Sequence, residues 1–284
     1  MGHVCSVTHK DYNSDNIYTW CTNCGNYGIH GALKNALVEE CIKPTDIVLC
    51  FDIGCNGNGS DKIGGYRAHT LHGRVIPFAM GAAIANPNVH VVASAGDGAT
   101  LGEGINHLIH AIRSDVNITF ILHNNCNYGL TTGQASPTTP MGVEMNSTPG
   151  VVEIPPINVA QLALSLNPSF YARSFSGNVK QLTQLIRLGI HHNGFSLVEV
   201  LQDCPTYNEA TPHNWYLERI YDITSVNDYS INNLEMAREA TADLSGHIAT
   251  GLLYKNGLDQ GFRKSVATLD HAPIEIKDLL DEFK

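Results

Sequence analysis

The stretch VVASAGDGATLGEGINHLIHAIRSD, residues 91–115, decides the fold of this chain, and ITFILHNNCNYGLTTGQASPTTP follows it at residues 118–140. An apolar run ends in a glycine turn that holds Asp97, a helical pattern follows, and a second apolar run ends at Asn125. This order predicts a strand, a turn, a helix and a second strand, which together form one βαβ unit. An acidic turn one unit before a carboxamide-rich turn suits a site that holds a hard metal ion against a diphosphate.

The same alternation continues on both sides of this unit. Continuous apolar runs predict buried strands at 46–54, 89–95, 117–123, 170–175 and 194–201. Helical spacing predicts helices after the CxxC turn of residues 21–24 and at 73–85, 101–114, 158–166 and 179–192. Strands that alternate with helices predict an α/β fold, a parallel sheet flanked by helices on both faces.

Several residues with reactive or ligating side chains come directly after predicted strands. Ligands bind at the carboxyl ends of the strands in such sheets. We therefore expect the glycine turn, the Asn-rich turn, Cys55 and Cys204 to gather on one edge. A Gly, Asn and His-rich loop at 56–72 lies between two elements, and loops of this length are more often functional than not.

The chain divides into three parts by composition. Residues 1–18 are polar and patternless, which predicts an N-terminal arm, and 19–210 carry the alternating pattern of the α/β domain. From 211 to 284 the sequence becomes polar and mixed, which predicts a C-terminal extension that contacts another subunit.

The composition excludes several classes of protein. With 43% hydrophobic and 15% charged residues among 284, the chain is expected to be a packed globular protein. A net charge of -10 and the absence of a Lys/Arg run argue against nucleic acid as a partner. No stretch reaches the roughly 18 apolar residues of a membrane span, and the N-terminus lacks the apolar core of a signal peptide. The expected location is the cytoplasm.

The residues themselves suggest an octahedral Mg²⁺ site. Asp97 offers a carboxylate, Asn125 an amide oxygen and Asn127 a backbone carbonyl, all of which are ligands that Mg²⁺ accepts. A helix that begins near Leu101 would direct free N–H groups at a diphosphate. The alternative is an ordinary strand-to-helix turn, with the asparagines serving only as turn residues.

The eight cysteines fall into three groups. In a cytoplasmic chain they are expected to be free thiols or metal ligands and not disulfides. Four are candidate metal ligands: Cys21 and Cys24 share a turn, and Cys55 and Cys204 each follow a predicted strand. Four thiolates suit either tetrahedral Zn²⁺ or a [4Fe–4S] cluster. A thioredoxin-like redox pair is a further possibility for the CxxC. Cys5, Cys41 and Cys50 are interpreted as inert, and Cys126 as a residue that lines the site.

These motifs together resemble the beta subunit of 2-oxoacid:ferredoxin oxidoreductases. The resemblance covers about 19–210 and is carried, in family order, by WCTNCGNYGI, DIGC, HTLHGR, the GDG turn, NYGLTTGQASPTTP and LQDCPTYN. It implies the diphosphate-binding domain of a thiamine diphosphate enzyme and one [4Fe–4S] cluster. Its implied cluster ligands are Cys21, Cys24, Cys55 and Cys204.

The resemblance also implies residues for the other cofactors. Asp97, Asn125 and the Asn127 carbonyl would hold Mg²⁺. The diphosphate would lie against His72, Gly73, Gly96 and Gly98, and the thiazolium site would be lined by Tyr128, Leu130 and Thr131. His72 is also a possible catalytic group, with loop packing as its alternative role.

The family reaction is the oxidative decarboxylation of a 2-oxoacid with CoA, which gives acyl-CoA, carbon dioxide and reduced ferredoxin. A separate alpha subunit would supply the pyrimidine-binding face and most substrate and CoA contacts, with pyruvate or 2-oxoglutarate as substrate. Two positions in the GDG helix depart from the family pattern, Ala99 and Glu103. The alternatives are a non-enzymatic, Zn-stabilised relative and a thiamine diphosphate decarboxylase that acts without ferredoxin.

Overall fold

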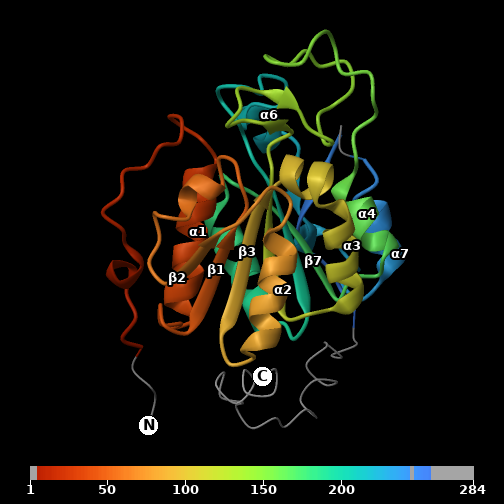
Figure 1. The fold of residues 1–284 in the computed structure, drawn as a ribbon. Helices are drawn as coiled ribbons and strands as arrows, with labels where there is room; N and C mark the ends of the chain where they lie inside the picture. The colour runs from red at the N-terminus through yellow and green to blue at the C-terminus, as the bar shows by residue number, and fades with distance from the viewer. Residues whose placement is uncertain (1–4, 244–245, 257–284) are drawn as a thin grey trace, which may run out of the picture.

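The computed structural model describes residues 5–243 and 246–256, whose main feature is an eight-stranded sheet in the order β2-β1-β3-β4-β8-β7-β10-β9 (Figure 1). Its strands are β1 (Ile47–Phe51), β2 (Tyr66–His69), β3 (His90–Gly96), β4 (Ile118–Asn124), β7 (Phe170–Phe175), β8 (Phe195–Leu201), β9 (Ile220–Asp222) and β10 (Ile248–Lys255). A small hairpin is formed by β5 (Asn127–Tyr128) and β6 (Gln134–Ala135). Every residue of β4, β7 and β8 is buried, as their apolar runs predict.

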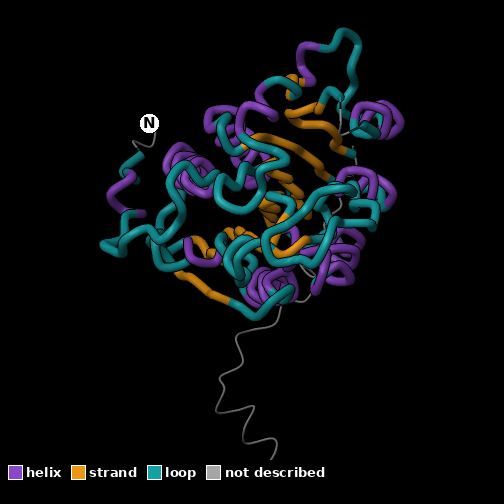
Figure 2. Tube along the Cα trace, turned by 90° about the horizontal axis from the view of Figure 1, so that it is seen from above, coloured by secondary structure: helices purple, strands orange, loops and turns teal. Residues whose placement is uncertain are grey.

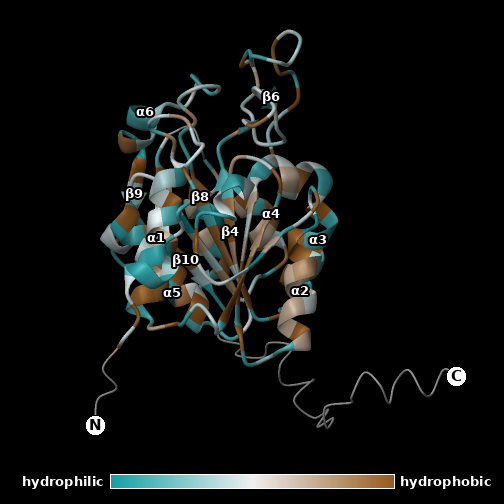
Figure 3. Ribbon diagram, turned by 60° about the vertical axis from the view of Figure 1, so that its left-hand side comes forward, coloured by the Kyte–Doolittle hydropathy of each residue, from teal (hydrophilic) through white to brown (hydrophobic). Residues whose placement is uncertain are grey.

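Helices cover both faces of the sheet (Figure 3). Figure 3 shows α1 (Asn26–Glu39) and α5 (Val179–His191) on one face of the sheet. The opposite face is covered by α2 (Val75–Ala85), α3 (Ile105–Ser114) and α4 (Val159–Ser165). Short elements complete the described chain: α6 (His213–Leu217), α7 (Leu234–Ala240), η1 (His9–Tyr12), η2 (Gly57–Gly59), η3 (Gly98–Glu103) and η4 (Ile223–Ser225). The two helical layers bury separate hydrophobic clusters on opposite sides of the strands.

The parallel strands aim their carboxyl ends at one edge of the sheet. Strands β1, β3, β4, β8 and β7 pair in parallel, so the loops that follow them emerge on the same side. Figure 2 looks onto this edge and shows the loops spread across it. The predicted α/β class and the predicted gathering of the loops are thus confirmed.

The predicted helix at 101–114 is interrupted. A π-helical turn, η3, ends at Glu103, and α3 begins after Gly104. A Cβ on Gly104 would lie 2.7 Å from the carbonyl oxygen of Gly73, so two backbone segments touch where a side chain would stand. This contact leaves no room for an ordinary residue at the break.

The predicted long loop at 56–72 contains a strand. β2 pairs in parallel with β1 at the edge of the sheet, and Tyr66, Arg67 and His69 in it are exposed. An exposed edge strand buries no face, so it lacks the apolar alternation by which a strand is recognised.

The N-terminal arm is folded back onto α1. Tyr12 is fully buried and its hydroxyl donates a 2.7 Å hydrogen bond to the carbonyl of Ile42. The prediction that Cys5 and Cys41 are free thiols is wrong, because the arm brings their Cα atoms to 5.6 Å and the two form a disulfide. A polar segment without periodicity gives no signal of its docking against the end of α1, which is why the pairing is not foreseen.

Two strands from the stretch after 211 join the main sheet. β10 pairs antiparallel with β7, and β9 pairs in parallel with β10. The sheet is therefore mostly parallel with one antiparallel pairing, between β7 and β10, and β9 and β10 run opposite to the other strands. Residues 257–284 of the predicted extension lie outside the described residues. In the part of the chain that the structure describes, no helix has the length and apolarity needed to cross a bilayer.

Candidate functional site

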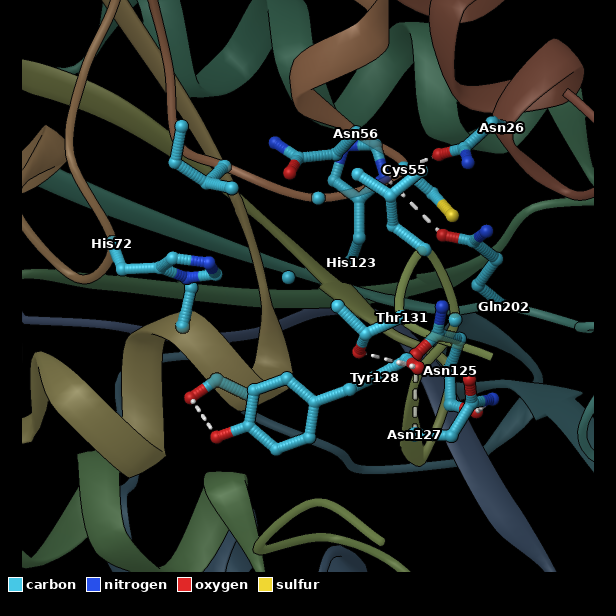
Figure 4. Close-up of a pocket in the computed structure, with 17 residues that line it drawn as sticks. Asn26, Cys55, Asn56, His72, His123, Asn125, Asn127, Tyr128, Thr131 and Gln202 are labelled. Carbon is cyan, nitrogen blue, oxygen red and sulfur yellow. Dashed lines mark hydrogen bonds between the residues drawn. The ribbon is translucent and has the colours of Figure 1, made fainter. Parts of the chain in front are cut away.

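A pocket opens at the carboxyl edge of the sheet, among the loops that follow β1, β3 and β4 (Figure 4). Nine of the predicted site residues line it: Cys55, His72, Gly96, Gly98, Asn125, Asn127, Tyr128, Leu130 and Thr131. Polar residues that the sequence did not single out also line it, among them Asn26, His123 and Gln202. Residues predicted from four separate motifs therefore share one cavity.

Asp97 lies fully buried in the glycine turn beside this pocket. Its Oδ2 accepts hydrogen bonds from the hydroxyls of Ser136 and Thr138, whereas Oδ1 is buried without a hydrogen-bond partner in the described structure. Burial raises the pKa of Asp97 to about 6, against the opposing effect of the two hydroxyls. Buried polar atoms without partners are rare. A free carboxylate oxygen at this place fits a bound cation.

The glycines of the turn meet different surroundings. A Cβ on Gly96 would find no atom within 4 Å, so the backbone here faces open space in the pocket wall. A Cβ on Gly98 would instead overlap the ring of Tyr128, whose hydroxyl donates to the Gly98 carbonyl and lies 3.2 Å from Oε1 of Glu103. Glu103, which departs from the family pattern, thus contacts a residue of the pocket.

The HTLHGR loop is held by a buried carboxylate that sequence reasoning missed. Asp52, at the end of β1, accepts hydrogen bonds from the backbone N–H groups of Ile53, Gly73 and Val75. These bonds fix the entry to α2 and bring His72 to the pocket, while Gly73 adopts a φ of 65° that favours glycine. The sequence signal that could have identified Asp52 is an acidic residue directly after an apolar strand.

The Asn-rich turn is a buried hydrogen-bonded unit. Asn127 donates its backbone N–H to Oδ1 of Asn125 at 3.2 Å and its side-chain amide to the Asn125 carbonyl at 2.9 Å. Asn208, in the LQDCPTYN segment, donates to that same carbonyl at 3.0 Å. This segment therefore supports the turn from the neighbouring strand end.

The four predicted ligand cysteines differ in exposure but approach one another. Cys24 and Cys204 are buried, Cys55 is partly buried and Cys21 is exposed. The sulfurs of Cys55 and Cys204 lie 3.3 and 3.8 Å from the point where a Cβ on Gly129 would stand. Burial, with the nearby thiols, raises the pKa of Cys55 to about 12, and burial raises that of Cys24 to about 11.

The side chains of the described residues do not form a ready-made metal site. Among residues 5–243 and 246–256, no group of three or more His, Cys, Asp or Glu side chains is arranged to hold a metal ion. The common ligation of one centre by Cys21, Cys24, Cys55 and Cys204 stays a prediction. Cys126, predicted to line the site, is not among the residues that line the pocket, and burial raises the pKa of its thiol to about 12.

His123, at the end of β4, connects the pocket wall to the CxxC turn. Its Nδ1 lies 2.9 Å from Oδ1 of Asn26 and 3.2 Å from Oε1 of Gln202, and its Nε2 lies 2.8 Å from Oγ of Ser94. Figure 4 shows both amides turned toward the imidazole. Burial lowers the pKa of His123 to about 3, so the ring is neutral. Its place within an apolar strand run concealed it from sequence reasoning.

Two protein families match this chain. "Thiamine pyrophosphate enzyme, C-terminal TPP binding domain" matches residues 52–200, and the family of the C-terminal region of the pyruvate ferredoxin oxidoreductase beta subunit matches residues 204–271. The first match begins directly after β1 and ends within β8, and the second begins at Cys204. The described pocket and the strand ends around it thus fall mostly inside the thiamine-binding match.

Curated relatives and a solved structure resemble the chain over most of its length. A Sulfolobus 2-oxoacid:ferredoxin oxidoreductase subunit beta is 36% identical over 272 residues, which cover 89% of this chain and 88% of the relative. The Mycobacterium tuberculosis 2-oxoglutarate oxidoreductase subunit KorB is 39% identical over a region that covers 71% of this chain and 54% of the length of KorB.

The solved structure is a 2-oxoglutarate:ferredoxin oxidoreductase from Magnetococcus marinus with 2-oxoglutarate, coenzyme A and succinyl-CoA bound. The two structures superpose with a TM-score of 0.88, and their sequences are 32% identical. The match covers 98% of this chain and 97% of the chain in the solved structure.

Proposed function

Because the chain belongs to the beta-subunit family of 2-oxoacid:ferredoxin oxidoreductases, we propose that it binds Mg²⁺, thiamine diphosphate and one [4Fe–4S] cluster. Together with an alpha subunit it converts a 2-oxoacid and CoA to acyl-CoA and carbon dioxide and passes the electrons to ferredoxin. One observation carries the proposal. One pocket has in its wall both Cys55 and the two glycines that flank Asp97, whose Oδ1 is buried without a hydrogen-bond partner in the described structure.

The diphosphate end of the cofactor is assigned to the glycine turn. Asp97, Asn125 and the Asn127 carbonyl hold Mg²⁺, since a hard cation prefers such oxygen ligands. The open backbone at Gly96 admits a phosphate group, and His72 lines the same pocket. Thiamine diphosphate, when bound, supplies the carbanion chemistry of the decarboxylation.

The chain's own residues then position the cofactor. Tyr128, Leu130 and Thr131 line the wall that follows the Asn-rich turn, and they orient the thiazolium end. Asp52 holds the loop of Gly73 and His72, so the diphosphate meets a preset surface. The π-helical turn η3 begins at Gly98, and its free N–H groups favour an anion.

The four thiols Cys21, Cys24, Cys55 and Cys204 are assigned to the cluster. Oxidation of a 2-oxoacid releases two electrons, and ferredoxin accepts them singly, so a one-electron carrier near the cofactor is required. An iron–sulfur cluster meets this need, whereas Zn²⁺ has no redox chemistry. The support is the position of Cys55 in the pocket wall and of Cys204 close to it.

The alpha subunit is assigned to the open side of the pocket. Apolar side chains are exposed on the loops around it, among them Leu71 at 76%, Leu130 at 48% and Ile154 at 78%. Exposed apolar groups near one site mark an interaction surface. We propose that these loops are covered by the alpha subunit, which completes the pocket and makes most contacts to substrate and CoA, in the cytoplasm.

The substrate is a 2-oxoacid, either 2-oxoglutarate or pyruvate. The Mycobacterium tuberculosis relative and the solved structure are named for 2-oxoglutarate, whereas the matching C-terminal family is described for pyruvate. The test is anaerobic co-expression of this chain with its alpha partner, followed by assays with each acid, CoA and ferredoxin. We expect a brown complex with four iron atoms per beta chain that reduces ferredoxin only with CoA present.

Two results would oppose this proposal. A colourless complex with one tightly bound zinc per chain would support the non-enzymatic alternative. A Cys55→Ala variant that still turns over the 2-oxoacid at the wild-type rate would support the ferredoxin-independent decarboxylase. If the cluster is bound as proposed, this variant no longer reduces any one-electron acceptor, with Cys50→Ala as the matched control.

A further inference from the structure

Two carboxamide side chains bridge His123 to the sulfur of Cys24. Asn26 donates from Nδ2 to Cys24 Sγ at 3.4 Å, and Gln202 donates from Nε2 to the same sulfur at 3.8 Å. The carbonyl oxygens of both amides face Nδ1 of His123. All four side chains are buried, and together they form a hydrogen-bonded unit between the CxxC turn and the end of β4.

The geometry of this unit fixes where its protons lie. Both partners of His123 Nδ1 are carbonyl oxygens, so Nδ1 must carry the hydrogen and donate it. Nε2 then accepts from the hydroxyl of Ser94, whose oxygen in turn accepts from Asn56 Nδ2 at 3.3 Å. With their oxygens held by the imidazole, both amides can only turn their N–H groups toward Cys24.

Hydrogen bonds to a ligand sulfur favour the reduced form of an iron–sulfur cluster. A reduced cluster carries one more negative charge than the oxidised cluster, and N–H dipoles at the sulfur stabilise that charge. Outer partners fix the orientation of the groups that contact a metal and its ligands. Asn26, His123 and Gln202 also line the cofactor pocket, so the unit stands between the cofactor and the thiol.

We propose that Asn26 and Gln202 are the hydrogen-bond donors that raise the reduction potential of the cluster at Cys24, and that His123 is the positioning residue that orients them. The inference rests on the proposed function, since it requires a cluster at Cys24. A purely structural role is the alternative, in which the unit only fills space beside the CxxC turn.

The test compares variants of the alpha–beta complex, purified anaerobically. Gln202→Leu and Asn26→Leu each remove one donor and retain most of the side-chain volume. Their dithionite-reduced clusters are expected to have a lower midpoint potential and altered EPR g values at unchanged iron content. His123→Leu should lower the potential as well, although His123 does not touch Cys24, and His123→Gln should restore part of it. Gln184→Leu, at an exposed position of α5, is the matched control.

A second measurement needs no variant. In wild-type complex labelled with ¹⁵N in the amides of Asn and Gln, pulsed EPR of the reduced cluster should detect ¹⁵N coupling. Iron-free wild-type protein would contradict the proposed function itself. A cluster that is present, lacks this coupling and keeps its midpoint potential in Gln202→Leu and Asn26→Leu would overturn the inference and leave the proposed function standing.

Discussion

The ring of Tyr128 lies directly against the backbone of Gly98, and its hydroxyl donates a hydrogen bond to the Gly98 carbonyl at 3.1 Å. A Cβ at position 98 would stand 2.4 Å from Cε1 of that ring. This contact joins the glycine turn after β3 to the hairpin after β4. The two motifs that define the pocket are therefore fitted to each other before any cofactor binds.

Gly98→Ala should destabilise the folded chain. The added methyl overlaps Tyr128, and overpacking of this kind costs about 1–3 kcal/mol in the free energy of unfolding. Denaturant unfolding measures it. Gly81→Ala is the matched control, because a Cβ there meets nothing within 4 Å and alanine favours the helix. Equal stability of the Gly98→Ala variant and wild type would contradict the contact between the ring and the turn.

Gly96→Ala should leave stability unchanged and weaken cofactor binding. Its Cβ would enter open space in the pocket, so the free protein has nothing to clash with. If the diphosphate lies against this backbone, the methyl excludes it, and calorimetric titration with thiamine diphosphate and Mg²⁺ should show at least a tenfold lower affinity, which corresponds to about 1.4 kcal/mol. Unchanged affinity would show that the diphosphate does not contact Gly96.

The chain should lose stability in mild acid through His30. This histidine is buried on α1, its Nε2 lies 3.1 Å from the Lys62 carbonyl, and burial followed by the charge of Lys34 lowers its pKa to about 4. The folded pKa lies below the ordinary value of 6.5, so this stability is present above pH 6.5 and is lost as the pH falls toward 4.

His30→Gln isolates that contribution. Between pH 7.5 and pH 5, the wild-type chain should lose about 2 kcal/mol more of its free energy of unfolding than the variant does. Urea unfolding at the two pH values provides the comparison. An identical pH dependence in both proteins would mean that His30 titrates normally in the folded state.

The Cys5–Cys41 disulfide should stabilise the chain independently of the cluster. It closes a loop with a sequence separation of 36, for which about 4 kcal/mol is expected. Reduction with a mild thiol should lower the stability of the wild type but not of Cys5→Ser, and iron content should remain the same. Counting thiols in the unfolded, unreduced chain should give six, the number of free cysteines in the structure. A count of all eight cysteines as thiols would show that the bond does not form.

Periodicity predicts the elements that bury a face, and it does not predict those that bury none. The strands β1, β3, β4 and β8 and the helices α1, α2 and α5 follow from apolar patterns, as does the gathering of their loops at one edge. β2 is not predicted because it is an exposed edge strand. The break at Gly104 is not predicted because it depends on the approach of a distant backbone, that of Gly73.

The pocket was predictable where a motif carries its chemistry. Asp97 and the Asn-rich turn lie together as the pattern indicated, yet Asp52 and His123 were not foreseen. Each of them lies at the end of a strand whose apolar run already explains why the residue is buried. Nothing in the local sequence therefore distinguishes a buried residue that forms hydrogen bonds from one that only packs. Their roles depend on residues far along the chain, such as Gly73 for Asp52 and Gln202 for His123.

The antiparallel strand β10 is translated after all the predicted site residues, and this order affects how the sheet edge is protected. The outer edge of β7 has hydrogen-bonding groups that pair with β10, and β10 ends at Lys255. During translation the nascent chain therefore completes every predicted site residue, the last being Cys204, before that edge can be covered. Unpaired edges invite aggregation. A recombinant chain shortened to the predicted boundary at 210 would keep its ligating side chains and still be prone to precipitate through β7.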